Sequence, residues 1–296
     1  MATKEVKFDF FLVKIPGQTH DVFDKFLDKE HSLSNKTEID MFGYTLRIGT
    51  MEKCRRNLSI PDIEDNYLWK VSVERINVSD EAYIGKKGKA GRETYASNPD
   101  EGPLSDTVFL YDPKTAVIIV QRARGGVNQS GMISYISKLC NIDEVELEVM
   151  IDPKVLDKLD KLPMVKSIEY SIATPTQLSE YKDDRRGIFG DIKLARLLGG
   201  SNLKIVIGAD KNEYLEKVKA VEKVKMILKT SQKVSVMKVN GLKDGEEEIL
   251  DLINKRIQYK EKINPGRGKK VTFLHIMDTI ENAYRAKEKI IIDYTK

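Results

Sequence analysis

The chain has 296 residues, 41% hydrophobic and 32% charged, which is the composition of a folded protein and excludes disorder of the whole chain. No apolar run approaches the roughly 20 residues that a bilayer-spanning helix needs, so we expect no membrane span. The formal net charge is only +4, so a basic patch would have to be local.

The first half of the chain predicts a β-rich domain over residues 1–142. Its first apolar run alternates as a strand does, and it is interrupted by Asp9 and Lys14 with no cleavage site after it, so it is not a signal peptide. Cys54 and Cys140 form no CxxC motif, which favours a reducing compartment, and we expect a cytoplasmic protein. The predicted elements are strands at 7–15, 44–48 and 68–76, a helix at 20–31, a hairpin of 107–111 with 116–122, and a helix at 132–139.

The second half predicts a ferredoxin-like βαββαβ domain over residues 143–296, with added helices. Asp152 and Asp210 each precede a helical segment in the capping position, and each segment lies between two strand-like runs. The strands are expected at 145–150, 165–173, 203–207 and 234–239, with helices at 153–162 and 212–229. An inserted loop and helix are expected over 177–200, a tail helix over 249–263 and a last helix over 272–289. The predicted fold class is therefore α+β.

Residue patterns typical of catalysis or metal binding are weak. His20, His31 and His275 lie in separate predicted elements without a ligand partner at metal-binding spacing. The glycine-rich segment 125–131 follows a strand and precedes a helix, but it lacks the spacing of a nucleotide loop, so a plain turn is favoured. The acidic run near Glu146 has no lysine at nuclease spacing. We therefore expect no catalytic residue, metal or cofactor, and the sequence favours a protein that is not an enzyme.

A concentrated basic segment is the most informative feature of the sequence. Residues 253–270 carry seven basic residues against one acid, Glu261, whereas the whole chain carries a net charge of only +4. Such a segment attracts a polyanion more than scattered charges do. Part of the charge could complement the dipole of the predicted tail helix. The candidate nucleic-acid ligands here are Lys255, Arg256, Lys260, Lys262, Arg267, Lys269 and Lys270.

A second basic segment is rich in glycine. Residues 85–92 are predicted to form a mobile loop, with Arg122 and Arg124 following the hairpin. Lysine and arginine in glycine-rich loops commonly hold the phosphodiester backbone without reading bases. This segment adds Lys86, Lys87, Lys89 and Arg92 to the candidate nucleic-acid ligands, together with Arg122 and Arg124.

Two stretches carry a resemblance to known proteins. Residues 101–112, continuing into 117–122 and Gly125-Gly126, look like the central hairpin of uncharacterised bacterial proteins of about this length. Residues 236–241 and 248–253 are similar to their C-terminal strand and helix. These proteins more distantly resemble the phage-exclusion protein RexA and the KwaB subunit of the Kiwa anti-phage system. The resemblance implies a two-domain α+β protein that binds DNA without strong sequence preference and acts in phage defence or exclusion.

The sequence thus predicts a nonspecific nucleic-acid-binding protein, with double-stranded DNA favoured. A divergent metal-dependent nuclease and a protein-interaction scaffold within a defence complex remain alternatives. The last predicted helix has an apolar face that either packs on its own domain or forms a homodimer interface. The residues of this face are Phe273, Ile276, Met277, Ile280 and Tyr284.

Overall fold

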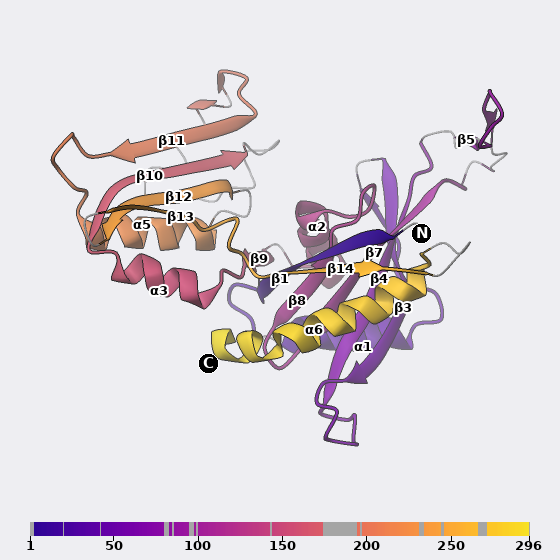
Figure 1. Cartoon of the computed structure of the whole chain (residues 1–296). Coiled ribbons are helices and arrows are strands. Elements are labelled where there is room, and N and C mark those ends of the chain that lie inside the picture. Colours follow the sequence, from indigo (N-terminus) through magenta and orange to yellow (C-terminus); the bar gives the residue numbers. More distant parts are fainter. Residues whose placement is uncertain are drawn as a thin grey trace. The chain divides into compact units, whose positions relative to one another are not determined.

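A computed structural model of the chain (Figure 1) describes two compact units. Unit 1 comprises Met1–Leu147 and Gln258–Lys296, and unit 2 comprises Glu148–Ile257. Among the described residues, helices make up 29% and strands 40%, and the sheets are antiparallel, which confirms the α+β class. The described residues are 3–19, 21–41, 43–79, 83–84, 86–94, 98, 100–142, 144–173, 194–195, 197–230, 234–243, 246–265 and 271–295.

Unit 1 is built on one eight-stranded sheet with the order β14-β1-β8-β7-β4-β3-β2, in which β9 also pairs with β1. The central strands are buried and rich in Val, Ile, Phe and Leu, as a sheet covered on both faces requires. The strands of this sheet are β1 (Lys4–Lys14), β2 (Ile39–Met41), β3 (Tyr44–Arg55), β4 (Tyr67–Ile76), β7 (Leu104–Asp112), β8 (Val117–Gln121), β9 (Glu146–Val149) and β14 (Gln258–Ile263).

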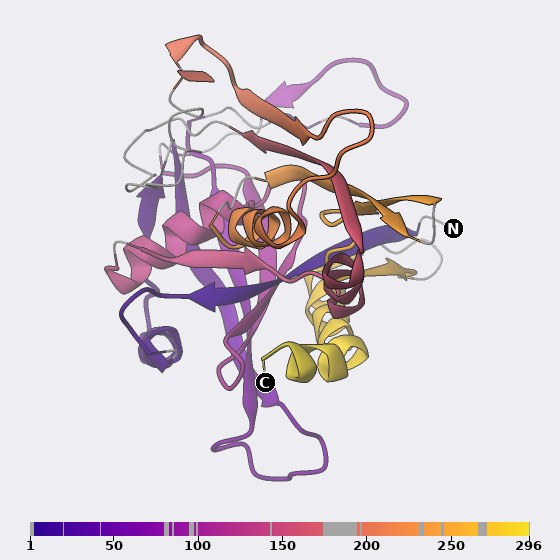
Figure 2. The same cartoon turned by 90° about the vertical axis from the view of Figure 1, so that its left-hand side faces the viewer.

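Helices cover both faces of this sheet. Tyr111 and Asp112 are successive residues of β7 and so point to opposite faces. Phe23 of α1 (Asp21–Ser32) packs edge-on against Tyr111, whereas Tyr284 of α6 (Phe273–Thr295) donates a hydrogen bond to Asp112. In Figure 2, α1 and α6 accordingly lie on either side of the strands. A third helix of this unit is α2 (Gln129–Cys140), which contacts α1.

The apolar face of α6 is used inside unit 1. Ile276, Met277, Ile280 and Tyr284 are buried, and the helix contacts β7, β8, β14, β1 and β4. This face therefore packs on its own unit, and the argument for a homodimer that rests on it loses its basis. No helix among the described residues is both long enough and apolar enough to cross a bilayer.

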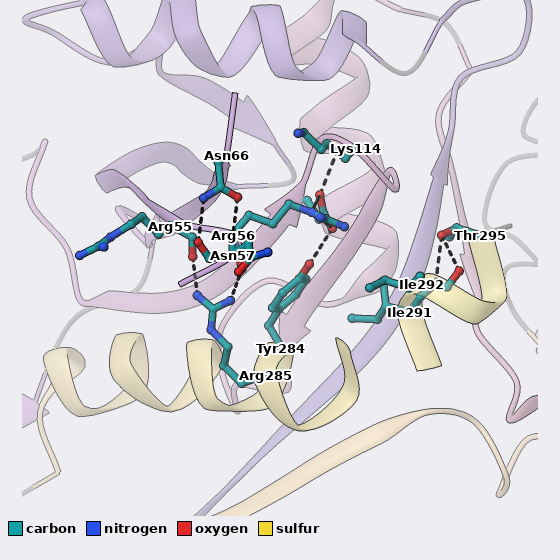
Figure 3. A network of polar contacts seen from close by, with 11 residues as sticks. Arg55, Arg56, Asn57, Asn66, Lys114, Tyr284, Arg285, Ile291, Ile292 and Thr295 are labelled. Atoms are coloured by element: carbon teal, nitrogen blue, oxygen red, sulfur yellow. Dashed lines mark hydrogen bonds and ion pairs between the residues drawn. The ribbon is translucent and has the colours of Figure 1, made fainter. Parts of the chain in front are cut away.

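A buried polar network joins α6 to the sheet (Figure 3). The carboxylate of Asp112 is fully buried and accepts hydrogen bonds from Arg56 Nε at 3.0 Å, the Tyr284 hydroxyl at 2.9 Å and the Lys114 amide at 3.0 Å. The guanidinium of Arg285 donates to the backbone carbonyls of Arg55 and Arg56. Each buried polar group named here has a partner, so the network fixes the position of the helix.

Unit 2 is a four-stranded antiparallel sheet in the order β11-β10-β12-β13. Its strands are β10 (Met164–Ala173), β11 (Asn202–Gly208), β12 (Val234–Lys243) and β13 (Glu246–Asp251). The helices α3 (Pro153–Lys161) and α5 (Lys217–Thr230) share one apolar core with this sheet. As predicted, Asp152 caps α3, and its side chain accepts from the Lys154 amide at 2.9 Å.

This sheet differs from the predicted ferredoxin-like arrangement. In a βαββαβ domain the strand before the first helix belongs to the same sheet, whereas β9, which precedes α3, pairs with β1. The fourth strand of the unit 2 sheet is instead β13, which pairs antiparallel with β12. Most of the segment predicted as an inserted loop and helix, residues 177–193, lies outside the described residues.

The tail also departs from the prediction. Residues 249–263 are predicted as a helix, but they form the end of β13, a turn and β14. Leu250 is buried against β12 while Ile249 is exposed, so the burial alternates as in a strand. Because β14 pairs with β1, residues 258–296 belong to unit 1 and not to a second domain beginning at residue 143.

Candidate nucleic-acid interface

Basic side chains gather on one face of the β14 end of the unit 1 sheet. Lys260 of β14 lies opposite Lys7 of β1, and the Arg122 amide binds the Lys7 carbonyl at 2.8 Å on the other side of that strand. Lys262 lies opposite Glu5, two residues along. Residues that face each other across antiparallel strands share a face, so these side chains form a row. We call Lys7, Arg122, Lys260 and Lys262 the β14 strip.

Two members of the strip are already paired with acids. Arg122 binds both oxygens of Asp9, a largely buried carboxylate on the same face, and Lys7 binds Glu5 at 2.8 Å. Lys7, through a hydrogen bond and its charge, lowers the pKa of the Glu5 carboxyl, and Lys260 and Lys262 lower it further. The four cations thus outnumber the two acids of this face.

Lys260 and Lys262 are the available charges. Both are exposed, and within the part of the chain that the structure describes neither has an acid at ion-pairing distance. Alternate strand residues are separated by about 7 Å, which corresponds to about two nucleotide steps of 3.4 Å along a duplex axis. The sequence predicted these two lysines, but it missed Lys7, whose alternation with Glu5 and Asp9 was the available signal.

The second basic segment forms a small ribbon. β5 (Tyr83–Ile84) and β6 (Glu93–Thr94) pair antiparallel, and the turn between them is closed by a hydrogen bond of 3.1 Å from the Lys89 amide to the Lys86 carbonyl. Its basic side chains are all exposed: Lys86, Lys87, Lys89 and Arg92. Between these two short strands the described residues 86–92 form a loop, as predicted, and its mobility stays a prediction.

The strip accounts for only some of the predicted ligands. Arg124 is exposed in the connection that follows β8. Lys255 is exposed, and Arg256 is half-buried and forms an isolated backbone β-bridge with Ile151. Lys255 and Arg256 both lie in unit 2. The basic segment of the sequence is therefore divided between the two units. Three of the predicted ligands lie outside the described residues: Arg267, Lys269 and Lys270.

Other candidate sites have structural explanations. His31 packs edge-on against Trp69, and His275 Nδ1 accepts from the Thr272 amide, while His20 lies outside the described residues. The described residues contain no group of three His, Cys, Asp or Glu that could hold a metal. Burial raises the pKa of the Cys54 thiol to about 11 and that of Cys140 to about 12, so neither is a ready nucleophile.

The glycine-rich turn before α2 serves the fold. Asn128 caps the helix by accepting from the Gly131 amide at 2.8 Å, and the Val127 amide binds Thr107 Oγ1 at 2.7 Å. Two of the amides that a phosphate would need are thus engaged, in agreement with the plain turn predicted here.

Comparisons with known proteins add one finding. The sequence matches the family of unknown function DUF6731 over residues 1–294, so the chain belongs to this family. A search of curated proteins finds no match.

Proposed function

We propose that this member of the DUF6731 family binds double-stranded DNA through the sugar-phosphate backbone, without sequence preference. The observation that carries the proposal is the β14 strip, in which Lys260 and Lys262 are exposed beside Lys7 and Arg122. Lysines without acidic partners can exchange counterions for phosphates, and this exchange supplies most of nonspecific affinity.

The strip favours a duplex over a single strand. Proteins that bind single strands stack bases on exposed aromatic side chains. On the described part of the strip the face carries charged side chains, and the nearest aromatic residue of β14, Tyr259, points to the other face, where its hydroxyl binds Glu261. A rigid sheet edge with evenly spaced cations suits the regular backbone of a duplex.

Replacement of two lysines tests this proposal. For Lys260→Gln/Lys262→Gln we expect weaker binding to every duplex sequence, and a log-log salt slope less steep by about 1.8, because each phosphate contact contributes about 0.9. Fluorescence anisotropy of a labelled duplex at two salt concentrations measures both quantities. Lys154→Gln/Lys161→Gln on exposed positions of α3 is the charge-matched control.

The outcomes are distinct. Unchanged affinity and slope in the strip variant, or an equal loss in the control, would remove the strip from the interface. The same series on duplex RNA distinguishes the two nucleic acids, because A-form RNA presents a different backbone spacing and 2′-hydroxyls.

A second candidate function is protein interaction, favoured by the loop between β3 and β4. The buried Asn66 side chain pins this loop by accepting from the Asn57 amide and donating to the carbonyls of Asn57 and Ile60. Three aliphatic side chains are nevertheless exposed on it: Leu58, Ile60 and Ile63. An ordered loop that presents apolar side chains is typical of a contact surface.

A second copy of the chain is the first partner to test for this loop. We expect sedimentation velocity at micromolar concentration to show an assembly that Leu58→Ser/Ile60→Ser dissociates. A wild-type chain that sediments as a monomer would exclude self-association through the loop and leave a different protein as the partner of a defence complex.

The proposed biological role is phage defence or exclusion, which rests on the resemblance of residues 101–112 and 236–241 described above. DNA binding without sequence preference suits a protein that meets invading genomes of any sequence. Plating efficiency of a phage panel on cells that express the chain tests the role. We expect protection to be lost with Lys260→Gln/Lys262→Gln, and equal plating with and without the wild-type chain would refute it.

A further inference from the structure

The β5–β6 ribbon is shaped for a groove. Tyr83 pairs with Thr94 and Ile84 with Glu93, and the turn has Gly88 at a φ of 83°, as a type II turn requires at its third residue. A Cβ added at Gly88 or Gly91 would meet nothing within 4 Å, so the backbone at the tip is uncrowded. The described residues therefore form a narrow two-stranded ribbon with an uncrowded tip.

Two of the ribbon's cations, Lys86 and Arg92, are held in place by its own side chains. Lys86 Nζ binds Glu93 Oε1 at 3.0 Å across the ribbon, and the Arg92 guanidinium lies over the Tyr83 ring at 4.5 Å. Lys87 and Lys89 are exposed at the turn. The described ribbon has four basic side chains against one acid, which suits contact with a polyanion on several sides.

Dimensions decide which groove fits. The major groove of B-DNA is about 12 Å wide and admits a two-stranded ribbon, whereas the minor groove is only about 6 Å wide. From Tyr83 to Lys87 the chain can reach at most about 13 Å at 3.3 Å per extended residue, which exceeds the groove depth of about 8.5 Å. The tip could therefore reach the groove floor while the base of the ribbon stays outside.

We infer that the β5–β6 ribbon enters the major groove of duplex DNA and contacts the phosphates of both groove walls. This inference rests on the proposed DNA binding and adds a second, separate contact to the β14 strip. Lys87 and Lys89 lie closest to the tip. Lys86 and Arg92 lie nearer the base of the ribbon, where they would contact the sugar-phosphate backbones at the two edges of the groove. Without an Asn or Gln among its described residues, the ribbon lacks the side chains that read adenine, which agrees with binding of any sequence.

A duplex with a filled major groove tests the inference. Glucosylated 5-hydroxymethylcytosine places a bulky sugar in the major groove and leaves the minor groove unchanged. Loss of even one phosphate contact at about 0.1 M salt costs about eightfold in affinity. We therefore expect the wild-type chain to bind the glucosylated duplex at least about eightfold more weakly than the unmodified one. The minor-groove ligand netropsin should not compete.

Two variants assign the effect to the ribbon. Lys86→Gln/Lys87→Gln/Lys89→Gln should bind both duplexes with the same reduced affinity, whereas the charge-matched Lys154→Gln/Lys158→Gln/Lys161→Gln should keep the wild-type ratio. Arg92→Ala is a milder ribbon variant that should reduce the ratio, and it serves if the triple variant binds too weakly to measure. Methylation of guanine N7 by dimethyl sulfate should be slowed by the wild-type chain and restored by Lys86→Gln/Lys87→Gln/Lys89→Gln, because N7 lies in the major groove that the tip lysines would enter.

The possible failures are separable. Equal affinity of the wild-type chain for both duplexes would overturn groove entry while leaving backbone binding by the β14 strip intact. An unchanged ratio in both ribbon variants would assign the groove contact to another element. No binding to either duplex would refute the proposed function itself.

Discussion

Replacing the buried carboxylate of Asp112 should uncouple α6 from the sheet of unit 1. Asp112→Asn keeps the shape of the side chain but removes the negative charge that Arg56, Tyr284 and the Lys114 amide share. The Arg56 side chain is only 16% exposed, so its charge would lose its buried partner with little access to water. Burial and the charge of Asp112 raise the pKa of the Tyr284 hydroxyl, which therefore remains a donor in need of an acceptor.

The expected cost follows from these contacts. Breaking a buried ion pair by removal of one partner costs about 3–5 kcal/mol, and the slight exposure of Arg56 places this variant near the lower value. For a unit of this size 1 kcal/mol lowers Tm by about 2–4 °C, so about 3 kcal/mol should lower it by about 6–12 °C. Tyr284→Phe removes one hydrogen bond to a charged group and should cost about 1.5–3 kcal/mol.

Thermal and urea unfolding followed by circular dichroism measure these changes. Asp278→Asn, at an exposed position of the same helix, is the matched control and should stay within about 0.5 kcal/mol of wild type. In the double variant the losses should not add, because both changes remove the same contact. An Asp112→Asn variant as stable as the control would refute the view that this network holds the helix.

Four further predictions concern Cys54, Gly102 and Gly88. The Cys54 thiol, with a pKa raised to about 11 by burial, should react with iodoacetamide at pH 8 at least about 100-fold more slowly in the folded chain than after unfolding, where its pKa is about 8.5. Because the folded-state pKa is the higher one, Cys54 should contribute its full stabilisation below about pH 8.5 and lose it as the pH rises towards 11. Gly102→Ala would place a Cβ 1.9 Å from the Asn77 carbonyl oxygen and should cost at least about 2 kcal/mol in urea unfolding. Gly88→Ala strains only the ribbon tip and should leave global unfolding within about 0.5 kcal/mol of wild type.

Features with local causes could be predicted from the sequence. The turn inside the predicted hairpin follows from local residues: Pro113 sets the backbone angle, and Asp112 Oδ1 accepts from the Lys114 amide two residues on. The cap at Asp152 was equally local. Each of these depends on a few neighbouring residues, so no information about the remote chain was needed.

The tail was predicted as a helix because its apolar residues fit the helical period of 3.6 residues, although part of the segment also fits the two-residue alternation of a strand. Ile249, Leu252, Ile253 and Ile257 fit a helical stripe, yet Ile249 is exposed and the others are buried in a turn and just before β14. Asp244-Gly245 is a strong hairpin signal between two strand-like runs, and it precedes the segment predicted here as the tail helix. Weighing that dipeptide would have predicted the pairing of β12 with β13.

The β14 strip lies beyond sequence reasoning for a different reason. Lys260 faces Lys7 across 253 positions of the chain, and Arg122 binds Asp9 across 113. Charge density along the sequence indicates that a basic surface exists, but only strand register decides which charges meet acids and which remain exposed. Register between strands so far apart cannot be read from composition.

The division of unit 1 into two stretches of chain has a consequence for synthesis. The ribosome completes residues 1–147 and then all of unit 2 before it makes β14 and α6. Until then the edge of β1 lacks β14, and the sheet face that Ile276, Met277 and Ile280 later cover is bare. Unit 2 is continuous in sequence and can fold while the chain is still growing, but the sheet and helix layers of unit 1 are complete only once residues 258–296 have been made. The nascent chain therefore exposes apolar strands for most of its synthesis, which is the period when binding by a chaperone would protect it.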